Sequence, residues 1–185
     1  AMLALVGGAL RRYLQAKGKL PDDSLVAMAP ISVRGPDQSG TMGNRISAML
    51  VNLGTHIEDP LTRLRAVSTG THESKRLSES IGAATLSEFS QLYPAALAGL
   101  AARLYSRFQL ANRVTPIFNC VVTNVPGPRQ PLFSGGARLV TQYGTGPVVD
   151  GMGLIVPIFS YCGEITISFT SCRDIVPDPA FLAEC

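Results

Sequence analysis

A run of β-branched and apolar residues that stops at two prolines constrains this chain more than any other stretch. Residues 117–125 favour a buried strand, and Pro126, Gly127 and Pro128 follow it directly. Pro126 fixes φ for the second position of a turn, and Gly127 suits the positive φ of the third position of a type II turn. Because Pro128 has no N–H, it cannot close that turn with a hydrogen bond. We therefore expect a rigid but open strand end.

This strand end has two interpretations. It suits the wall of a site, because Thr123 and Asn124 would be held in fixed directions beside carbonyls that lack turn partners. It would equally serve as a plain strand terminator, because Asn and Pro-Gly are ordinary turn residues. The residue types leave both interpretations open.

Composition describes one globular domain or a large half of a two-part protein. The 185 residues are 46% apolar and 16% charged, so we expect part of the exterior to be buried against something else. The net charge of +3 excludes a dedicated nucleic-acid arm but allows a basic face for phosphates or anionic lipid. The sequence contains no apolar run of about 18 residues and no signal-peptide layout.

Cysteine and histidine spacing argues against both a zinc site and a catalytic set. The cysteines at 120, 162, 172 and 185 form no C-x-x-C pair, and neither His56 nor His72 stands at metal-ligand spacing. We expect free, mostly buried thiols in a reducing compartment. We expect His72 to be simply exposed, and His56 has no serine or cysteine partner in a recognisable spacing, so no complete catalytic set is visible.

Periodicity and breaker residues predict alternating helices and strands. The expected order is a helix at 2–17, strands at 25–33 and 46–53, a helix that starts at Asp59-Pro60, helices near 78–92 and 94–111, the strand at 117–125, strands at 153–161 and 164–172 joined at Cys162-Gly163, and a helix capped by Asp178. Gly7-Gly8 permits the first helix to pack closely on a sheet. Both ends lie inside helical patterns, so we expect a fragment.

Two further features of the sequence each have two interpretations. Asn44 and Arg45 stand where a strand enters the sheet, and they could either face a cleft or satisfy loop carbonyls. The helix at 94–111 has an apolar stripe with Arg103 and Arg107 on another face. It could lie on a membrane surface or pack its stripe on a sheet while water solvates its arginines.

Four blocks in order along the chain carry a resemblance to a known family. They are Gly7–Leu14 (GGALRRYL), Ala29–Arg34 (APISVR), Gly43–Arg45 (GNR) and Thr123–Pro128 (TNVPGP). Together they resemble the C-terminal half of the bacterial wax ester synthase/diacylglycerol acyltransferase family, over essentially the whole chain. The asparagine-valine-proline-glycine-proline block is the most specific of them.

The resemblance implies the fold and the reaction. It implies an α/β fold, a two-layer sandwich with a mixed β-sheet covered by helices, in a chloramphenicol-acetyltransferase-like lobe that spans residues 1–185. The family transfers a long acyl chain from acyl-CoA, as co-substrate and with no cofactor, to a fatty alcohol or a diacylglycerol. Its base is the second histidine of an H-H-x-x-x-D-G motif in an N-terminal lobe. That motif is absent here, as is the Asn-Asp pair that usually precedes the first helix, so this chain alone should be inactive.

The resemblance also implies roles for named residues. The half present here would line the substrate channel, with Asn124 and Thr123 as a polar anchor and Asn44 as a second polar contact. Pro126, Gly127 and Pro128 would be the rigid support. Arg45 could reach a CoA phosphate. The expected location is cytoplasmic, with possible contact to a membrane or lipid-inclusion surface and with no nucleic-acid partner.

Two other functions remain open at this point. One is a non-catalytic lobe that binds a lipid or a protein partner. The other is a condensation-type domain that acts on carrier-bound acyl groups and shares the sandwich. An upstream lobe with the histidine motif argues against the first, and a requirement for a carrier-bound donor would support the second.

Overall fold

The computed structural model describes residues 1–32, 46–81, 103–104, 107–108 and 116–185. In chain order the elements are α1 (Met2–Ala16), β1 (Val26–Ser32), β2 (Ile46–Asn52), α2 (Pro60–Ile81), β3 (Cys120–Pro126), β4 (Phe133–Ser134), β5 (Ala137–Arg138), β6 (Leu154–Tyr161), β7 (Glu164–Ile167), β8 (Thr170–Ser171) and α5 (Pro179–Glu184). Asn44 and Arg45 lie outside the described residues, as does most of the two helices expected between residues 78 and 111. Arg103, Leu104 and Arg107, within the second of them, are helical.

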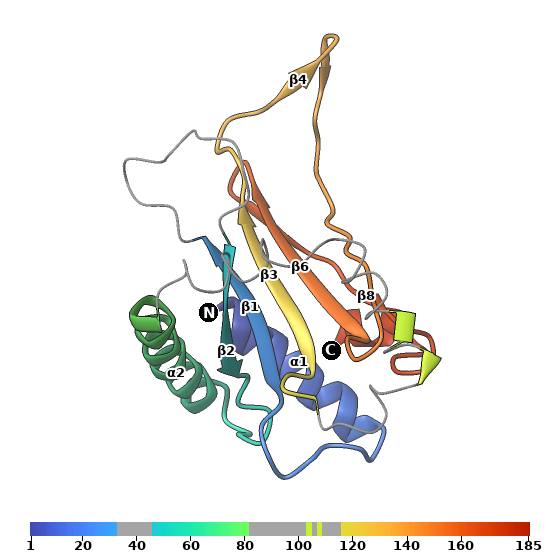
Figure 1. Ribbon diagram of the computed structural model, residues 1–185. Helices are drawn as coiled ribbons and strands as arrows, with labels where there is room; N and C mark the ends of the chain where they lie inside the picture. The colour runs from blue at the N-terminus through green and yellow to red at the C-terminus, as the bar shows by residue number, and fades with distance from the viewer. Residues whose placement is uncertain (33–45, 82–102, 105–106, 109–115) are drawn as a thin grey trace.

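The centre of the molecule is a mixed sheet with strand order β2-β1-β3-β6-β7, in which β8 also pairs with β6 (Figure 1). Strands β1, β3 and β6 are parallel, with Ala27 opposite Cys120 and Val122 opposite Val156. The outer strands β2, β7 and β8 run antiparallel to their neighbours. The predicted α/β class with a mixed sheet is confirmed.

Helices α1, α2 and α5 form a layer on one face of this sheet. The period of two along each strand places Ala27, Cys120, Val122, Val156 and Ile158 on that face, where they pack with α1. From α1, the buried Val6, Leu10 and Tyr13 enter the same cluster at helical spacing. The opposite face of β6 is covered in part by residues 144–146, which approach Ile155, Pro157 and Phe159.

Gly7 sets how closely α1 approaches the sheet layer. A Cβ atom at Gly7 would lie 2.1 Å from the Leu53 carbonyl oxygen, just after β2. A Cβ at Gly8 would lie 2.9 Å from the Arg63 guanidinium of α2. The predicted close packing at the glycine pair is therefore confirmed, and a larger residue at Gly7 would push against backbone.

Helix α2 begins as predicted and continues further than predicted. The Asp59 carboxylate accepts a hydrogen bond from the Thr62 N–H at 2.7 Å, which caps the helix before Pro60. The expected start of a separate helix near Ser78 is wrong, because α2 runs unbroken from Pro60 to Ile81. The polar residues after Val67 change the chemistry of its surface without introducing a proline that would stop it.

The expected type II turn at Pro126, Gly127 and Pro128 is also wrong. Pro126 is the last residue of β3 and lies opposite Ser160, and Gly127 is not among the glycines with positive φ. The chain continues along β6, because the Gly127 N–H donates to Ser160 Oγ at 3.2 Å and the Cys162 N–H donates to the Pro128 carbonyl at 3.0 Å. Gly127 is needed for close approach, since a Cβ there would lie 2.1 Å from the Ser160 carbonyl oxygen.

Residues 129–149, here called the arm, leave the sheet beyond the carboxyl ends of the parallel strands; the tip with β4 stands away from the sheet (Figure 1), and residues 144–146 return beside β6. The arm carries the short hairpin of β4 and β5. At its base the Tyr161 hydroxyl accepts from the Leu132 N–H and donates to the Leu139 carbonyl, both at 2.9 Å. The Leu139 N–H also donates to the Leu132 carbonyl at 2.9 Å.

The predicted hairpin between β6 and β7 is confirmed, with Cys162 and Gly163 both at positive φ, as a type I′ turn requires. The second strand is not continuous to Cys172 as expected, because the ladder is interrupted between Ile167 and Thr170. The break lies opposite Pro157, which has no N–H to donate to Ser168.

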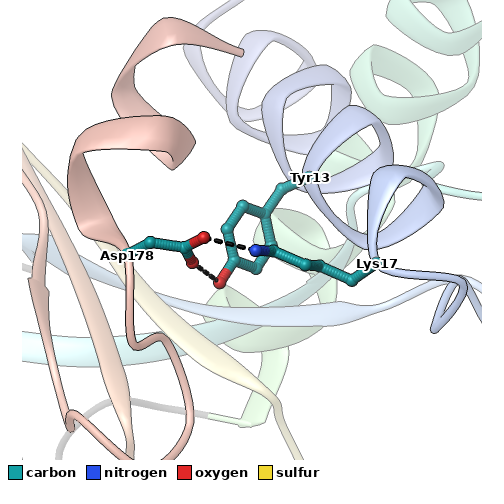
Figure 2. A network of polar contacts seen from close by, with 3 residues as sticks. All are labelled: Tyr13, Lys17 and Asp178. Carbon is teal, nitrogen blue, oxygen red and sulfur yellow. Dashed lines mark hydrogen bonds and ion pairs between the residues drawn. The ribbon is translucent and has the colours of Figure 1, made fainter.

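Asp178 precedes α5, but its side chain does not cap that helix as predicted. Figure 2 shows its carboxylate bound to the Tyr13 hydroxyl of α1 and to the ammonium of Lys17, the residue directly after α1. The Asp178 carboxylate therefore binds the charged Lys17 instead of capping α5 as the local sequence predicted. These bonds lower the pKa of Asp178, through Lys17 first and Tyr13 second.

The four cysteines are free thiols, as predicted, but only Cys120 is fully buried. Burial raises the pKa of the Cys120 thiol to about 12, which keeps it protonated and unreactive at neutral pH. The other three, Cys162, Cys172 and Cys185, are partly exposed, so the expectation of mostly buried thiols is wrong.

Candidate functional site

A pocket of about 560 Å³ opens between the helix layer and the sheet, and we call it the strand-end pocket. The start of α1, one side of α2 and the carboxyl-terminal halves of β1 and β3 line it. In open α/β sheets the carboxyl ends of parallel strands are where ligands bind most often. The position of this pocket therefore makes it the first candidate for a functional site.

The floor of the strand-end pocket is apolar. Strand alternation turns Ala29, Met49, Val122 and Ile158 toward the helix layer, and all four line the pocket. Met2 and Leu3 at the start of α1 also line it. A floor of this kind accepts hydrocarbon.

Asn124 is the polar residue that the sheet contributes to the pocket. It lies on β3 opposite Ile158 and two residues after the buried Val122, so it is on the helix-covered face. Thr123 points to the other face of β3 and is not among the residues that line the pocket. The structure therefore separates the two residues that were expected to act together.

The polar wall of the pocket comes from α2. Ser68, Thr71, His72 and Lys75 line it at steps of three, one and three residues, which place them on one side of the helix. Thr71 donates its hydroxyl hydrogen to the Val67 carbonyl at 2.6 Å, so toward the pocket it offers lone pairs. We name these four residues the α2 stripe.

The α2 stripe was missed by the sequence reasoning, which expected His72 to be simply exposed. His72 is exposed, and it also faces the strand-end pocket. The signal was present in the sequence as a polar set at helical spacing directly after the apolar residues Leu64 and Val67.

Of the other expected site residues, Pro126, Gly127 and Pro128 lie just beyond Asn124 and join β3 to the arm. They do not line the strand-end pocket. His56, the other histidine, is exposed in the segment before α2, where its carbonyl accepts a hydrogen bond from Arg11 at 3.2 Å.

A second pocket, of about 490 Å³, lies between α1, α2 and α5 and is mostly apolar. Arg12 and Arg63 border it. Arg63 is buried, and its Nη1 donates to the Ile57 carbonyl at 2.8 Å, which fixes the segment before α2. Burial lowers the pKa of Arg63, and Arg11 and Arg12 lower it further. Arg11 and Arg63 thus hold the segment before α2, whereas Arg12 donates to the Cys185 carbonyl at 3.1 Å.

In the described parts of the chain no group of three His, Cys, Asp or Glu residues could hold a metal ion. No helix among the described residues is both long and apolar enough to cross a bilayer. Among the described residues, Asn124, His72 and Lys75 offer the strand-end pocket hydrogen-bond donors above an apolar floor. That combination can bind and orient an amphipathic ligand.

Comparison with known proteins agrees with this geometry. A probable diacylglycerol O-acyltransferase of Mycobacterium tuberculosis is 36% identical over 180 residues, which are 96% of this chain and 38% of that protein. The O-acyltransferase WSD of Acinetobacter baylyi is 34% identical over 178 residues, 95% of this chain and 38% of that protein. This chain thus spans less than two fifths of the length of the curated relatives that it matches.

A solved structure gives the same result. The wax ester synthase/diacylglycerol acyltransferase from Marinobacter aquaeolei VT8 matches with a TM-score of 0.66 and 27% identity, over 98% of this chain and 40% of that one. Residues 42–185 match the family described as the WS/DGAT C-terminal domain. The chain therefore belongs to the WS/DGAT C-terminal domain family, as the four sequence blocks predicted.

Proposed function

We propose that the complete protein transfers a long acyl chain from acyl-CoA to the hydroxyl of a fatty alcohol or a diacylglycerol. The observation that supports this most directly is an apolar pocket with polar residues at its edge, in a chain whose relatives are named O-acyltransferases. In that reaction the acceptor oxygen attacks the thioester carbonyl, a C–O bond forms and the C–S bond breaks. A base must take the hydroxyl proton and return it to the leaving sulfur.

The base belongs to the partner lobe in this proposal. Among the described residues neither His56 nor His72 has a paired nucleophile, and an N-terminal lobe with the H-H-x-x-x-D-G motif would supply the histidine. Acyl-CoA is a co-substrate, and the direct transfer requires no further cofactor. Peripheral contact with a membrane or lipid inclusion would deliver the acceptor.

Asn124 is the polar anchor of this lobe. Its position at the end of a parallel strand, above Val122 and Ile158, suits an amide that donates to the thioester oxygen as negative charge develops there. Pro126, Gly127 and Pro128 keep the strand end rigid through their pairing with β6. Thr123 stays in the proposal as the residue that holds the other face of β3.

Asn44 and Arg45 keep the roles expected from the sequence, that of Arg45 from its charge alone. Asn44 would be a second polar contact, and Arg45 would reach a phosphate of the donor. Both residues precede β2, the edge strand beside β1.

The experiment uses the full-length protein with acyl-CoA and each acceptor. Asn124→Ala should lower kcat/KM by roughly 100-fold, because one oxyanion donor is lost, while thermal stability stays close to that of the wild type. Thr123→Val, the neighbouring change on the other face of β3, is the matched control and should lower the rate far less.

Three results would count against this proposal. An unchanged rate for Asn124→Ala would return that residue to a structural role. Wild-type protein that turns over carrier-bound acyl groups but not acyl-CoA would support a condensation-type reaction instead. Binding of lipid without any turnover would support a non-catalytic lobe.

A further inference from the structure

The pocket between α1, α2 and α5, here called the helix pocket, is a second place where this lobe can hold a small molecule. Its volume of about 490 Å³ lies within the range of roughly 300–1,000 Å³ that is usual for small-molecule sites. Of the described residues that line it, only Ala1 also lines the strand-end pocket. Its wall is mostly apolar, with Leu5, Leu64 and Phe169 among the lining side chains. A hydrocarbon chain can therefore lie here without entering the strand-end pocket.

Arg63 places a guanidinium group in the wall of the helix pocket, although its side chain is only 8% exposed. Among the described residues, the hydrogen bonds of this group, to the Ile57 and Glu58 carbonyls, both come from Nη1. The buried Nε has no hydrogen-bond partner. A Cβ atom at Gly8, which lines the pocket, would lie 2.9 Å from Nη2 and 3.6 Å from Nε. The Nε–Nη2 edge of Arg63 thus lies beside the pocket with no acceptor among the described residues.

The charge around this edge is positive. Arg12 also lines the helix pocket, while no aspartate or glutamate is among the described residues that line it. Burial lowers the pKa of Arg63, the charges of Arg11 and Arg12 lower it further, and Asp59 opposes them with a smaller effect. A buried cation without a carboxylate beside it is costly, and an anion bound at its free edge would offset that cost.

We propose that the helix pocket binds a fatty acid, with the carboxylate on the Nε–Nη2 edge of Arg63 and the hydrocarbon chain along the apolar wall. The two oxygens of a carboxylate match two parallel N–H groups of a guanidinium, which is the arrangement in which arginine binds an anion most strongly. Arg12 adds a second positive charge at the same pocket. An uncharged lipid would leave the buried edge unpaired, so the site selects the acid. This inference does not depend on the acyl transfer proposed above.

The test measures the dissociation constant of dodecanoate for the full-length protein by titration calorimetry, below the concentration at which dodecanoate forms micelles. Methyl dodecanoate has the same chain and no charge, and it should bind at least about 10-fold more weakly. Arg12→Met removes one charge at the pocket and should weaken dodecanoate binding about 10-fold. This variant leaves Arg63 in place, whose bond to the Ile57 carbonyl also holds the segment before α2.

Arg65→Met is the matched control for the loss of charge. Arg65 is exposed on α2 and is not among the residues that line the helix pocket. Its replacement removes the same charge from the protein and should change the dissociation constant of dodecanoate by less than about twofold.

A second pair of variants tests the pocket without changing any charge. Ala183 is exposed on α5 and lines the helix pocket, so Ala183→Phe should occupy part of it and weaken dodecanoate binding at least about 10-fold. Ala180 is exposed on the same helix and is not among the lining residues, so Ala180→Phe should change the binding by less than about twofold. Thermal unfolding of each variant checks that the fold is intact.

Dodecanoate binding that either Arg12→Met or Ala183→Phe leaves unaltered would place the acid elsewhere in the protein and overturn the inference. Equal affinities for dodecanoate and its methyl ester, or no binding of dodecanoate by the wild type, would overturn it as well. Weaker binding in both variants, with both controls unchanged, supports the site whether or not the protein transfers acyl chains.

Discussion

Two glycines in the middle of helices have opposite surroundings. Gly7 in α1 faces the Leu53 carbonyl, which a Cβ would meet at 2.1 Å, whereas a Cβ at Gly70 in α2 would have no atom within 4 Å. The intrinsic cost of a glycine inside a helix is the same at both sites. The difference in packing therefore decides how replacement by alanine changes the stability at each site.

Gly7→Ala should lower the free energy of unfolding by about 1–3 kcal/mol, because α1 must shift away from backbone atoms that cannot rotate aside. Gly70→Ala should raise it by up to about 1 kcal/mol, since alanine favours the helix and meets open space. Denaturant unfolding of the two variants against the wild type measures both signs. A gain in stability for Gly7→Ala would contradict the close approach of α1 to Leu53.

Single residues also show where sequence reasoning succeeds and fails. Asn124 was selected from its place beside two prolines, and it lines the pocket. The turn expected at Gly127 does not form, because the pairing of β3 with β6 joins residues about 30 positions apart and holds the chain extended. Local sequence offers no sign of that partner.

At the scale of elements, the Asp178 carboxylate adds polar bonds to the contact between α1 and α5 (Figure 2). Its pKa is lowered, so the folded state binds a proton at this group less readily than the unfolded chain does. The stabilisation is complete above the ordinary aspartate pKa of about 4 and is lost as the pH falls through the lowered value.

Asp178→Asn should therefore be less stable than the wild type at neutral pH, and the difference should shrink below about pH 4. Thermal unfolding of both proteins across the acid range measures this. The exposed Asp174, changed to Asn, is the control and should give only a small difference in stability. A gap for Asp178→Asn that does not narrow in acid would rule out the carboxylate as its source.

The same contact also changes stability in the alkaline range, where stability is lost as the pH rises instead of as it falls. Burial, followed by the hydrogen bond to Asp178, raises the pKa of Tyr13 to about 12. Its contribution is present below the ordinary tyrosine value of about 10 and is lost as the pH rises toward 12. The Tyr13→Phe variant should lack this alkaline component, which absorbance of the phenolate during a pH titration can follow.

Elements with local signals were the predictable ones. The Asp59-Pro60 start of α2 and the hairpin at Cys162-Gly163 both follow from adjacent residues. The same local rule predicted that Asp178 would cap α5, but its carboxylate binds Lys17 instead. Lys17 lies 161 positions away in the chain, so the local sequence gives no sign of this partner. The α2 stripe became a pocket wall through packing of α2 beside β2 and α1.

For the whole molecule, the arm is the feature that points beyond this chain. Its exposed apolar side chains are Leu132, Phe133, Val140, Tyr143 and Val149. It projects from the end of the sheet at which Asn124 lies (Figure 1). With the relatives more than twice as long as this chain, we expect the N-terminal lobe of the same protein to cover the arm.

In the full-length protein the Gly135-Gly136 tip should consequently resist proteolysis. Phe133→Ser should increase cleavage there on the order of 10-fold, because a buried aromatic anchor is lost. Leu61→Ser is the matched control, since Leu61 is 64% exposed on α2 and Phe133 is 66% exposed on the arm. Rapid cleavage of the wild-type tip, or protection that depends on protein concentration, would assign the arm to solvent or to a second copy.

The hydroxyl of Tyr161 joins Leu132 to Leu139 and so closes a ring at the root of the arm. We expect that changes in the residues between Leu132 and Leu139 are not transmitted to the sheet. Residues inserted or deleted at the Gly135-Gly136 tip would alter the reach of the projection while Asn124 and its pocket keep their geometry. The length of the tip can therefore change without any change to the residues that line the strand-end pocket.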